Sequence, residues 1–254
     1  MLIDSHCHFD DRSFDQDRQD AWQRARDSGV MAQIIPAVIA DDWTRVKQNC
    51  QEFSGLFPAY GLHPMFCHKH SNGDLQTLRE WIEREQPVAV GECGLDFYIP
   101  DPDKKRQFGL FEAQLDIASE FNLPVIIHAR KAVDDVINLL RDHPSLRGVL
   151  HSYSGSLQQA ERLVEMGFLM SFGGPVTYPR ATRLQQVVAE LPLEAIMLES
   201  DAPDQPDSQH HGQRNEPSYL PLILQQISEI RGQSPEMISN QTSINAMKLF
   251  GIVI

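Results

Sequence analysis

The chain has 254 residues, of which 41% are hydrophobic and 22% are charged, a composition typical of a globular protein with a sizeable core. No apolar run approaches the roughly 18 residues of a membrane-spanning helix, so no membrane association is expected. The formal net charge of −13 argues against broad, sequence-independent binding to nucleic acid, which depends on Lys and Arg contacts to phosphates. A phosphate-containing substrate is not excluded, because bound cations and a few arginines can reverse the potential inside one cleft.

Short apolar segments rich in β-branched or aromatic residues alternate with amphipathic segments along the chain. The expected strands are, in chain order, 1–6, 31–38, 56–62, 87–92, 123–128, 147–151, 168–173 and 195–200. The expected helices are 13–28, 42–53, 74–85, 104–121, 131–142, 156–166, 180–190 and 217–231, followed by a further C-terminal helix at 235–249. The first residues lack the basic segment and apolar run of a signal peptide, so a cytoplasmic location is expected.

This alternation predicts an α/β fold in which helices connect parallel strands. Eight such units in about 250 residues favour a single (β/α)8 TIM barrel that spans residues 1–254 and carries an extra C-terminal helix. The alternative is an open doubly wound sheet, but no Gly-rich dinucleotide fingerprint follows the first expected strand. The polar stretch 202–216 follows the last expected strand, where barrel loops shape the active site, and both a functional loop and a disordered one fit its composition.

Six residues of the types that bind metal ions fall at or just after the ends of expected strands. They are His6, His8, Glu92, His128, His151 and Asp201. A barrel brings the carboxyl ends of all its strands to one face, where catalysis takes place. Each histidine alone is as compatible with a structural hydrogen bond, whereas a carboxylate in an apolar strand needs a partner, and a divalent cation supplies one. The joint pattern therefore predicts a metal site.

Imidazole and carboxylate ligands without thiolate suit zinc, manganese, cobalt or a related ion such as magnesium. Six ligands are too many for one catalytic zinc, so two divalent ions are expected. His6, His8 and Asp201 are assigned to one ion and His128 and His151 to the other, with Glu92 bridging both. Two ions would supply a nucleophilic hydroxide near neutral pH, and Asp201 would orient the nucleophile or take its proton. Asp201 and Glu92 are therefore the expected catalytic residues.

Three further residues are candidates for substrate binding. His63 ends an expected strand and would bind substrate or donate a hydrogen bond to a ligand, with a purely structural hydrogen bond as the alternative. Arg130 lies two residues past His128, and its guanidinium would match an anionic substrate oxygen unless an ion pair occupies it. Arg214, in QRNEP, is the weaker candidate of the two arginines.

Several segments make the chain resemble the TatD family of metal-dependent hydrolases, within the amidohydrolase-like barrels. They are LIDSHCHFD at 2–10, GLHP at 61–64, GECGLDFY at 91–98, PVIIHARKAVDD at 124–135, HSYSG at 151–155, LESDAP at 198–203 and RNEP at 214–217. The resemblance implies a TIM barrel with two divalent ions held by the same six residues. Family members include DNases with exonuclease activity and members that act on other substrates.

We therefore expect a two-metal hydrolase of phosphodiesters, a TatD-type DNase that works as a 3′ to 5′ exonuclease on DNA. The first alternative is a metal-dependent hydrolase of a small ester, amide or phosphomonoester, which the acidic loop favours because it holds Asp204 and Asp207. The second alternative is a non-catalytic, metal-stabilised binding protein. DNA or a small phosphoester is the expected partner, as substrate, and no obligate protein partner is expected.

Overall fold

The structure, a computed structural model, describes residues 1–71 and 73–254. Eight parallel strands form one sheet in the order of the chain. The strands are β1 (Leu2–Asp4), β2 (Val30–Pro36), β3 (Leu56–Tyr60), β4 (Ala89–Asp96), β5 (Val125–Arg130), β6 (Gly148–Leu150), β7 (Phe168–Phe172) and β8 (Ile196–Leu198). The helices are α1 (Arg18–Asp27), α2 (Trp43–Glu52), α3 (Asp74–Glu85), α4 (Lys104–Glu120), α5 (Val133–Leu140), α6 (Leu157–Glu165), α7 (Thr182–Glu190), α8 (Leu220–Arg231) and α9 (Pro235–Phe250).

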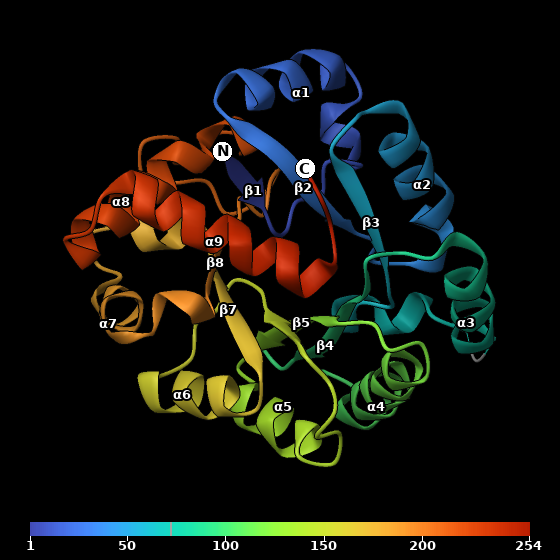
Figure 1. The fold of residues 1–254 in the computed structure, drawn as a ribbon. Coiled ribbons are helices and arrows are strands. Elements are labelled where there is room, and N and C mark those ends of the chain that lie inside the picture. Colours follow the sequence, from blue (N-terminus) through green and yellow to red (C-terminus); the bar gives the residue numbers. More distant parts are fainter. Residues whose placement is uncertain (72) are drawn as a thin grey trace.

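The sheet closes where β8 lies beside β1. The backbone N–H of Ser5 donates to the carbonyl of Leu198 over 2.9 Å, and that of Asp201 donates to His6 over 2.9 Å. Helices α1 to α8 form a ring outside the strands (Figure 1). The predicted (β/α)8 barrel with an extra C-terminal helix is confirmed. Among the described residues, no helix is both long enough and apolar enough to cross a membrane.

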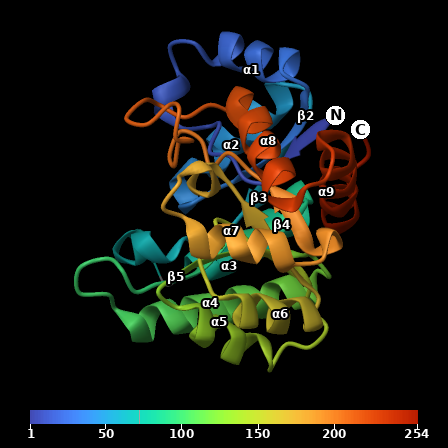
Figure 2. The same cartoon turned by 90° about the vertical axis from the view of Figure 1, so that its left-hand side faces the viewer.

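The extra helix α9 covers the amino-terminal end of the barrel. Barrel side chains such as Ile34, Ile126 and Met197 form one buried cluster with Leu249 and Phe250 of α9. Both chain termini lie at this end, while long loops extend from the opposite end (Figure 2). With one end closed by apolar packing, the carboxyl end of the strands is the end open to a substrate.

Two strands run past the positions expected from the sequence. The expectation that the fourth strand ends at Glu92 is wrong, because β4 continues to Asp96. The expectation that the fifth strand ends at His128 is wrong as well, because β5 continues to Arg130. Gln107 of α4 extends β4, since its side-chain amide bonds to the backbone N–H and C=O of Asp96 over 2.8 and 2.9 Å. The alternation of apolar and polar residues within a strand does not reveal a side-chain contact with the following helix.

The polar segment 202–216 folds back onto the barrel. Asn215 anchors it, because its side-chain amide donates to the carbonyls of Ser200 and Asp204 over 2.7 Å each. Asp207 is buried, and it accepts from His210 Nδ1 at 2.7 Å. The described segment is therefore a packed loop. Pro203, Asp204 and Gln205 of this loop line a cavity at this end of the barrel, and a functional role for the loop stays a prediction.

Gly94 allows β4 to approach β5 beside the site. Its φ is +132°, and a Cβ built there would lie 2.1 Å from the carbonyl oxygen of His128. We expect Gly94→Ala to destabilise the protein by more than about 1 kcal/mol in chemical unfolding, because both backbone strain and the clash oppose the native state. Gly109→Ala is the matched control: Gly109 lies within α4 with open space around it, and the added methyl should stabilise by about 0.5–1 kcal/mol. Equal unfolding free energies for the two variants would contradict the prediction.

Candidate metal centre

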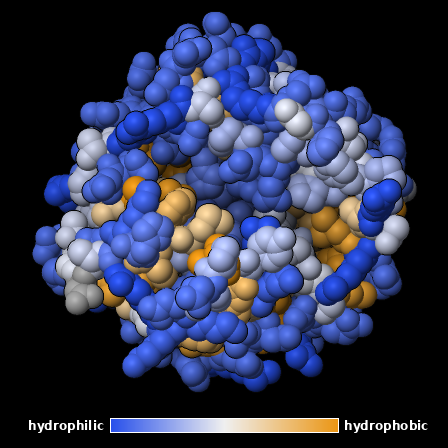
Figure 3. Space-filling view, turned by 180° about the vertical axis from the view of Figure 1, so that it is seen from behind, coloured by the Kyte–Doolittle hydropathy of each residue, from blue (hydrophilic) through white to orange (hydrophobic). Residues whose placement is uncertain are grey.

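The barrel brings the six predicted ligands to the carboxyl end of its strands. Two follow β1, one lies in β4, one lies in β5, one follows β6 and one follows β8: His6, His8, Glu92, His128, His151 and Asp201. Five of them line a cavity of about 800 Å³, and His6 lies buried beneath it. Figure 3 shows this face, with a hollow near its centre and apolar residues gathered on two sides of it.

The first group of ligand atoms lies between β1, β4 and β8. The Nε2 atoms of His6 and His8 are 3.3 Å apart, and Glu92 Oε2 lies 3.2 and 3.4 Å from them. Asp201 Oδ1 lies 3.5 Å from His6 Nε2 and 3.7 Å from His8 Nε2. A tetrahedron of ligands about 2.0–2.2 Å from an ion has edges of about 3.3–3.6 Å, and these five separations are close to that range, as expected for ligands of one divalent ion.

The second group lies on the other side of the same carboxylate. Glu92 Oε1 lies 3.1 Å from His128 Nδ1 and 2.8 Å from His151 Nε2, and these two nitrogens are 3.1 Å apart. Each Glu92 oxygen thus faces a different pair of histidines. Three protein ligands match a catalytic ion, which keeps a further position for water or substrate.

Glu92 is 1% exposed, and its Oε2 has no hydrogen-bond partner among the described residues. A buried carboxylate oxygen without a partner is costly, and a cation between it and the facing histidines removes that cost. Burial opposes the charged form of Glu92, but His63, His151 and His6 outweigh it and hold its pKa well below the usual range. Burial, together with His151, lowers the pKa of His6 to about 3. A charged Glu92 and a neutral His6 are the forms that bind a cation.

Asp201 occupies a different environment from Glu92. Burial raises its pKa to about 6, although His151 and His8 oppose the shift. Its φ is +56°, in the left-handed region, and its Oδ2 accepts a short hydrogen bond from the Gln205 side-chain amide. Its other oxygen is therefore directed at His6 and His8. Two carboxylates whose environments move their pKa values apart are the usual arrangement for one ligand and one proton acceptor.

Two of the ligand rings have a second partner that orients them. His8 Nδ1 lies 3.2 Å from the carbonyl oxygen of Pro36, and His128 Nε2 lies 3.0 Å from Asp96 Oδ2. A carboxylate on the far nitrogen of a metal-binding histidine fixes its tautomer and its orientation. Asp96 is not among the residues predicted from the sequence, although its place four residues after Glu92 on the same face of one strand was an available signal.

His63 lies next to Glu92 with both ring nitrogens engaged. Nδ1 accepts from the backbone N–H of Met65 at 3.1 Å, and Nε2 lies 2.8 Å from Glu92 Oε1. In a neutral ring whose Nδ1 accepts, the proton is on Nε2, so His63 donates to Glu92. His63, Glu92 and His128 are close enough to form a metal-binding group. However, if His63 bound an ion through Nε2, it could no longer donate the Nε2–H hydrogen bond to Glu92. His63 also lines the cavity, so contact with a substrate stays a prediction.

The structure separates the two predicted arginines. Arg130 lines the cavity, and its guanidinium lies over the ring of Tyr98, 3.9 Å from the ring centre. Arg214 does not line it: its guanidinium donates to both carboxylate oxygens of Asp17 and to Glu216, at 2.7 Å each. These bonds tie the loop 202–216 to the segment before α1, which is a structural role.

Comparison with known proteins identifies the family. The family model "TatD related DNase" matches residues 3–251. The chain belongs to the TatD family. A relative from Escherichia coli (strain K12), described as the uncharacterized metal-dependent hydrolase YjjV, is 40% identical over 254 residues, which covers 99% of this chain and 98% of that protein. The uncharacterized metal-dependent hydrolase YabD of Bacillus subtilis (strain 168) is 34% identical over 254 residues, 99% of this chain and 100% of that protein.

Solved structures agree with this assignment to the TatD family. The crystal structure of YjjV superposes with a TM-score of 0.96 at 39% identity, and the match covers 99% of this chain and 98% of that one. A TatD family hydrolase from Entamoeba histolytica shares the fold, with a TM-score of 0.85 at 20% identity over 98% of this chain and 97% of that one. This TatD protein is a metal-dependent hydrolase with a TIM-barrel fold, as the sequence predicts.

Proposed function

We propose that this TatD protein hydrolyses phosphodiester bonds in DNA and removes nucleotides from the 3′ end, with two divalent ions bound on either side of Glu92. The observation that supports two ions is the buried Glu92 carboxylate, each of whose oxygens faces a separate pair of histidines. The donor set of imidazole and carboxylate suits zinc, manganese or cobalt, and magnesium is the weaker candidate. The 3′ to 5′ direction rests on the resemblance to exonucleases of the family.

Bound ions would polarise a phosphoryl oxygen and lower the pKa of a water molecule, which makes it a nucleophile near neutral pH. The residues of the chain provide the rest of the chemistry. Asp201 accepts the proton of the attacking water and is held in place by Gln205. His63 donates to Glu92 Oε1 and so restrains the carboxylate between the two histidine pairs. Glu92 lines the cavity but is only 1% exposed, which limits the access of bulk water to its carboxylate.

Arginines at the cavity suit an anionic substrate. Arg12, Arg45 and Arg130 line it, and no carboxylate lies within ion-pair distance of any of them in the part of the chain that the structure describes. By contrast, Arg24 and Arg214, which lie outside the cavity, are both paired with Asp17 and Glu216. Three guanidiniums without carboxylate partners can bind phosphate oxygens on either side of the scissile bond.

Apolar side chains line the cavity beside the arginines. Met65 and Phe66 contribute from the segment after β3, and Phe172 and Leu184 contribute from β7 and α7. Bases and sugars present flat or apolar surfaces, and stacking on such side chains contributes about 1–3 kcal/mol per base in proteins that bind single strands. The combination fits the end of a single strand better than a long duplex, which would need a broad basic surface.

The direct test uses purified protein, Mn²⁺ or Zn²⁺, and single-stranded DNA labelled at its 5′ end. We expect a ladder of products shortened stepwise from the 3′ end, and no products when a chelator is present. An oligonucleotide with a blocked 3′ end provides the control and should resist cleavage. If the protein with added metal cleaved no phosphodiester at all, including a chromogenic one, the proposed function would be wrong.

Arg130→Gln is expected to raise the KM for DNA by about 10- to 150-fold and to change kcat less, because a hydrogen bond to a charged group contributes about 1.5–3 kcal/mol. Arg141→Gln is the matched control, since Arg141 is exposed, donates a hydrogen bond to Asn138 and lies outside the cavity. Steady-state kinetics on a short oligonucleotide separates the two parameters. An unchanged KM in Arg130→Gln would remove Arg130 from the substrate contacts.

A second candidate function is hydrolysis of a small phosphomonoester or carboxylic ester. The observation in its favour is that Asp10, Asp11, Asp42 and Asp204 also line the cavity, and their charges oppose a polyanion. A panel of small chromogenic substrates discriminates between the two functions. Turnover of a monoester or carboxylic ester well above the nuclease rate would favour this second function.

A further inference from the structure

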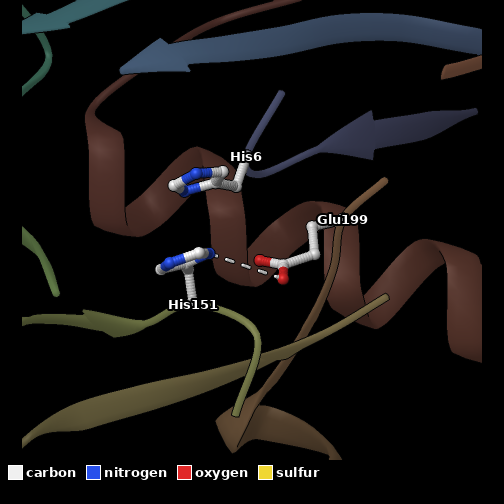
Figure 4. A group of neighbouring side chains, drawn as sticks. All are labelled: His6, His151 and Glu199. Carbon is white, nitrogen blue, oxygen red and sulfur yellow. Dashed lines mark ion pairs between the residues drawn. The ribbon is translucent and has the colours of Figure 1, made fainter. Parts of the chain in front are cut away.

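Glu199 is a buried carboxylate that the sequence analysis did not single out. It directly follows β8, is 0% exposed and lies beside His6 and His151 (Figure 4). Its Oε1 accepts from the backbone N–H of Ser152 at 2.6 Å and lies 3.8 Å from His151 Nδ1. A fully buried carboxylate is costly unless it is paired, and one backbone donor does not offset that cost.

Three buried atoms around Glu199 have no hydrogen-bond partner among the described residues: His6 Nδ1, His151 Nδ1 and Glu199 Oε2. The two rings are stacked, with their centres 3.8 Å apart and their planes at 10°. One nitrogen from each ring and one oxygen of Glu199 lie within 4.8 Å of one another. The two rings and this carboxylate thus lie together in a buried place, and each of the three residues has one polar atom there without a hydrogen-bond partner among the described residues.

The chemistry of the two rings makes them complementary to this carboxylate. Both direct Nε2 at Glu92: His6 Nε2 lies 3.2 Å from Oε2, and His151 Nε2 lies 2.8 Å from Oε1. A neutral imidazole that uses Nε2 as a ligand carries its proton on Nδ1, so each ring has one N–H to donate on its far side. For His8 and His128 the far nitrogen already has Pro36 or Asp96. The far nitrogens of His6 and His151 have no hydrogen-bond partner among the described residues, and Glu199 lies beside both rings.

We propose that Glu199 is a positioning residue that accepts the Nδ1–H of both His6 and His151 and thereby couples the two ion positions. The inference rests on the two-ion function proposed above, because His6 belongs to one ligand group and His151 to the other. The 3.8 Å contact with His151 Nδ1 is longer than a hydrogen bond, and closing it needs a movement of about 1 Å. Asp96, by contrast, forms its only contact with a described ligand ring at His128, and so acts on one ion position.

The test is Glu199→Gln, which keeps the shape of the side chain but replaces one acceptor oxygen with an NH₂ group. The remaining oxygen has two lone pairs and cannot accept from Ser152 and from both rings. Zn²⁺ affinities are measured by competition with a chelator of known affinity. We expect both zinc affinities to fall by about 10–100-fold, the range typical of partners that orient metal ligands. Asp96→Asn is the matched control, and it should lower the zinc affinity of the position at His128. Any indirect effect on the other position, transmitted through the shared Glu92, will appear in this control as well.

Unfolding of chelator-treated protein distinguishes positioning from a merely structural role. Glu199→Gln should be no less stable than wild type without ions, because the substitution removes a buried charge. A structural residue would lower that stability and leave both zinc affinities unchanged. Unchanged affinities, or loss of one affinity alone as in Asp96→Asn, would overturn the inference.

A measurement on the wild-type chain keeps the inference testable if the variant does not fold. Imidazole ¹⁵N spectra of the zinc-loaded protein should show His6 and His151 protonated at Nδ1, and His128 protonated at Nε2. An Nε2–H tautomer at His6 or His151 would contradict the role of Glu199. Wild-type protein that binds fewer than two zinc ions would overturn the two-ion function itself, whereas two ions with an unaffected Glu199→Gln variant would overturn this inference alone.

Discussion

Glu92→Gln should lower metal-dependent hydrolysis by about a thousandfold or more, the effect typical of losing a residue on which the whole site depends. The physical reason is the position of its two oxygens, which face separate histidine pairs. An amide has one oxygen and one NH₂ group, so in either orientation it presents hydrogen atoms to one pair. We therefore expect this variant to bind at most one ion, as measured by metal content after gel filtration.

The matched control for Glu92→Gln is Glu112→Gln. Glu112 is exposed on α4 and lies outside the cavity, so its substitution should leave activity and metal content unchanged. Chemical unfolding in the presence of a chelator shows whether the Glu92→Gln protein is folded. Without ions, the loss of a buried charge should change the free energy of unfolding little. A Glu92→Gln protein that bound two ions and retained substantial activity would contradict the bridging role.

Asp201→Asn should lower kcat by about 100- to 10,000-fold, the range for removal of a group that transfers a proton. Asn tolerates the left-handed backbone conformation at φ +56°, so the fold should not change. Gln205 donates to the outer oxygen of Asp201, which would direct the amide oxygen of Asn outward and its NH₂ group toward His6 and His8. The variant should therefore lose both the proton acceptor and one ligand atom.

Single-turnover rates over a range of metal concentrations separate the two losses in Asp201→Asn. Excess metal should restore occupancy of the weakened position without restoring the rate. Asp142→Asn is the control, because Asp142 is exposed and distant from the cavity lining. If excess metal restored the full rate, Asp201 would be a ligand and not a proton acceptor.

The barrel and the six-residue group were predictable because both depend on local pattern. Strand and helix periods repeat along the chain, and a barrel places the carboxyl end of every strand at one face. His6, His8 and Asp201 could therefore be assigned to one site although the last of them is almost 200 residues from the first two. The extent of β4 was not predictable, since it depends on the side chain of Gln107 in α4.

The residues that orient the ligand rings were not predicted from the sequence. Glu199 is recognisable only once the ring nitrogen of His151 is placed beside it. The spacing of Asp96 from Glu92 becomes informative only once β4 is known to continue past Glu92 and to bring Asp96 to His128. Arg214 had the residue type of an anion-binding group, but Asp17, its partner, lies at the other end of the chain. Such pairings arise from packing between distant segments, and no spacing rule encodes them.

The central claim is that two divalent ions bind on either side of Glu92. Anomalous diffraction from zinc-loaded crystals, recorded on both sides of the zinc absorption edge, tests it directly. We predict two peaks, one between Glu92 Oε2 and the His6–His8 pair and one between Glu92 Oε1 and the His128–His151 pair. A single peak at saturating zinc, or a peak bound by His63 in place of His151, would contradict the account.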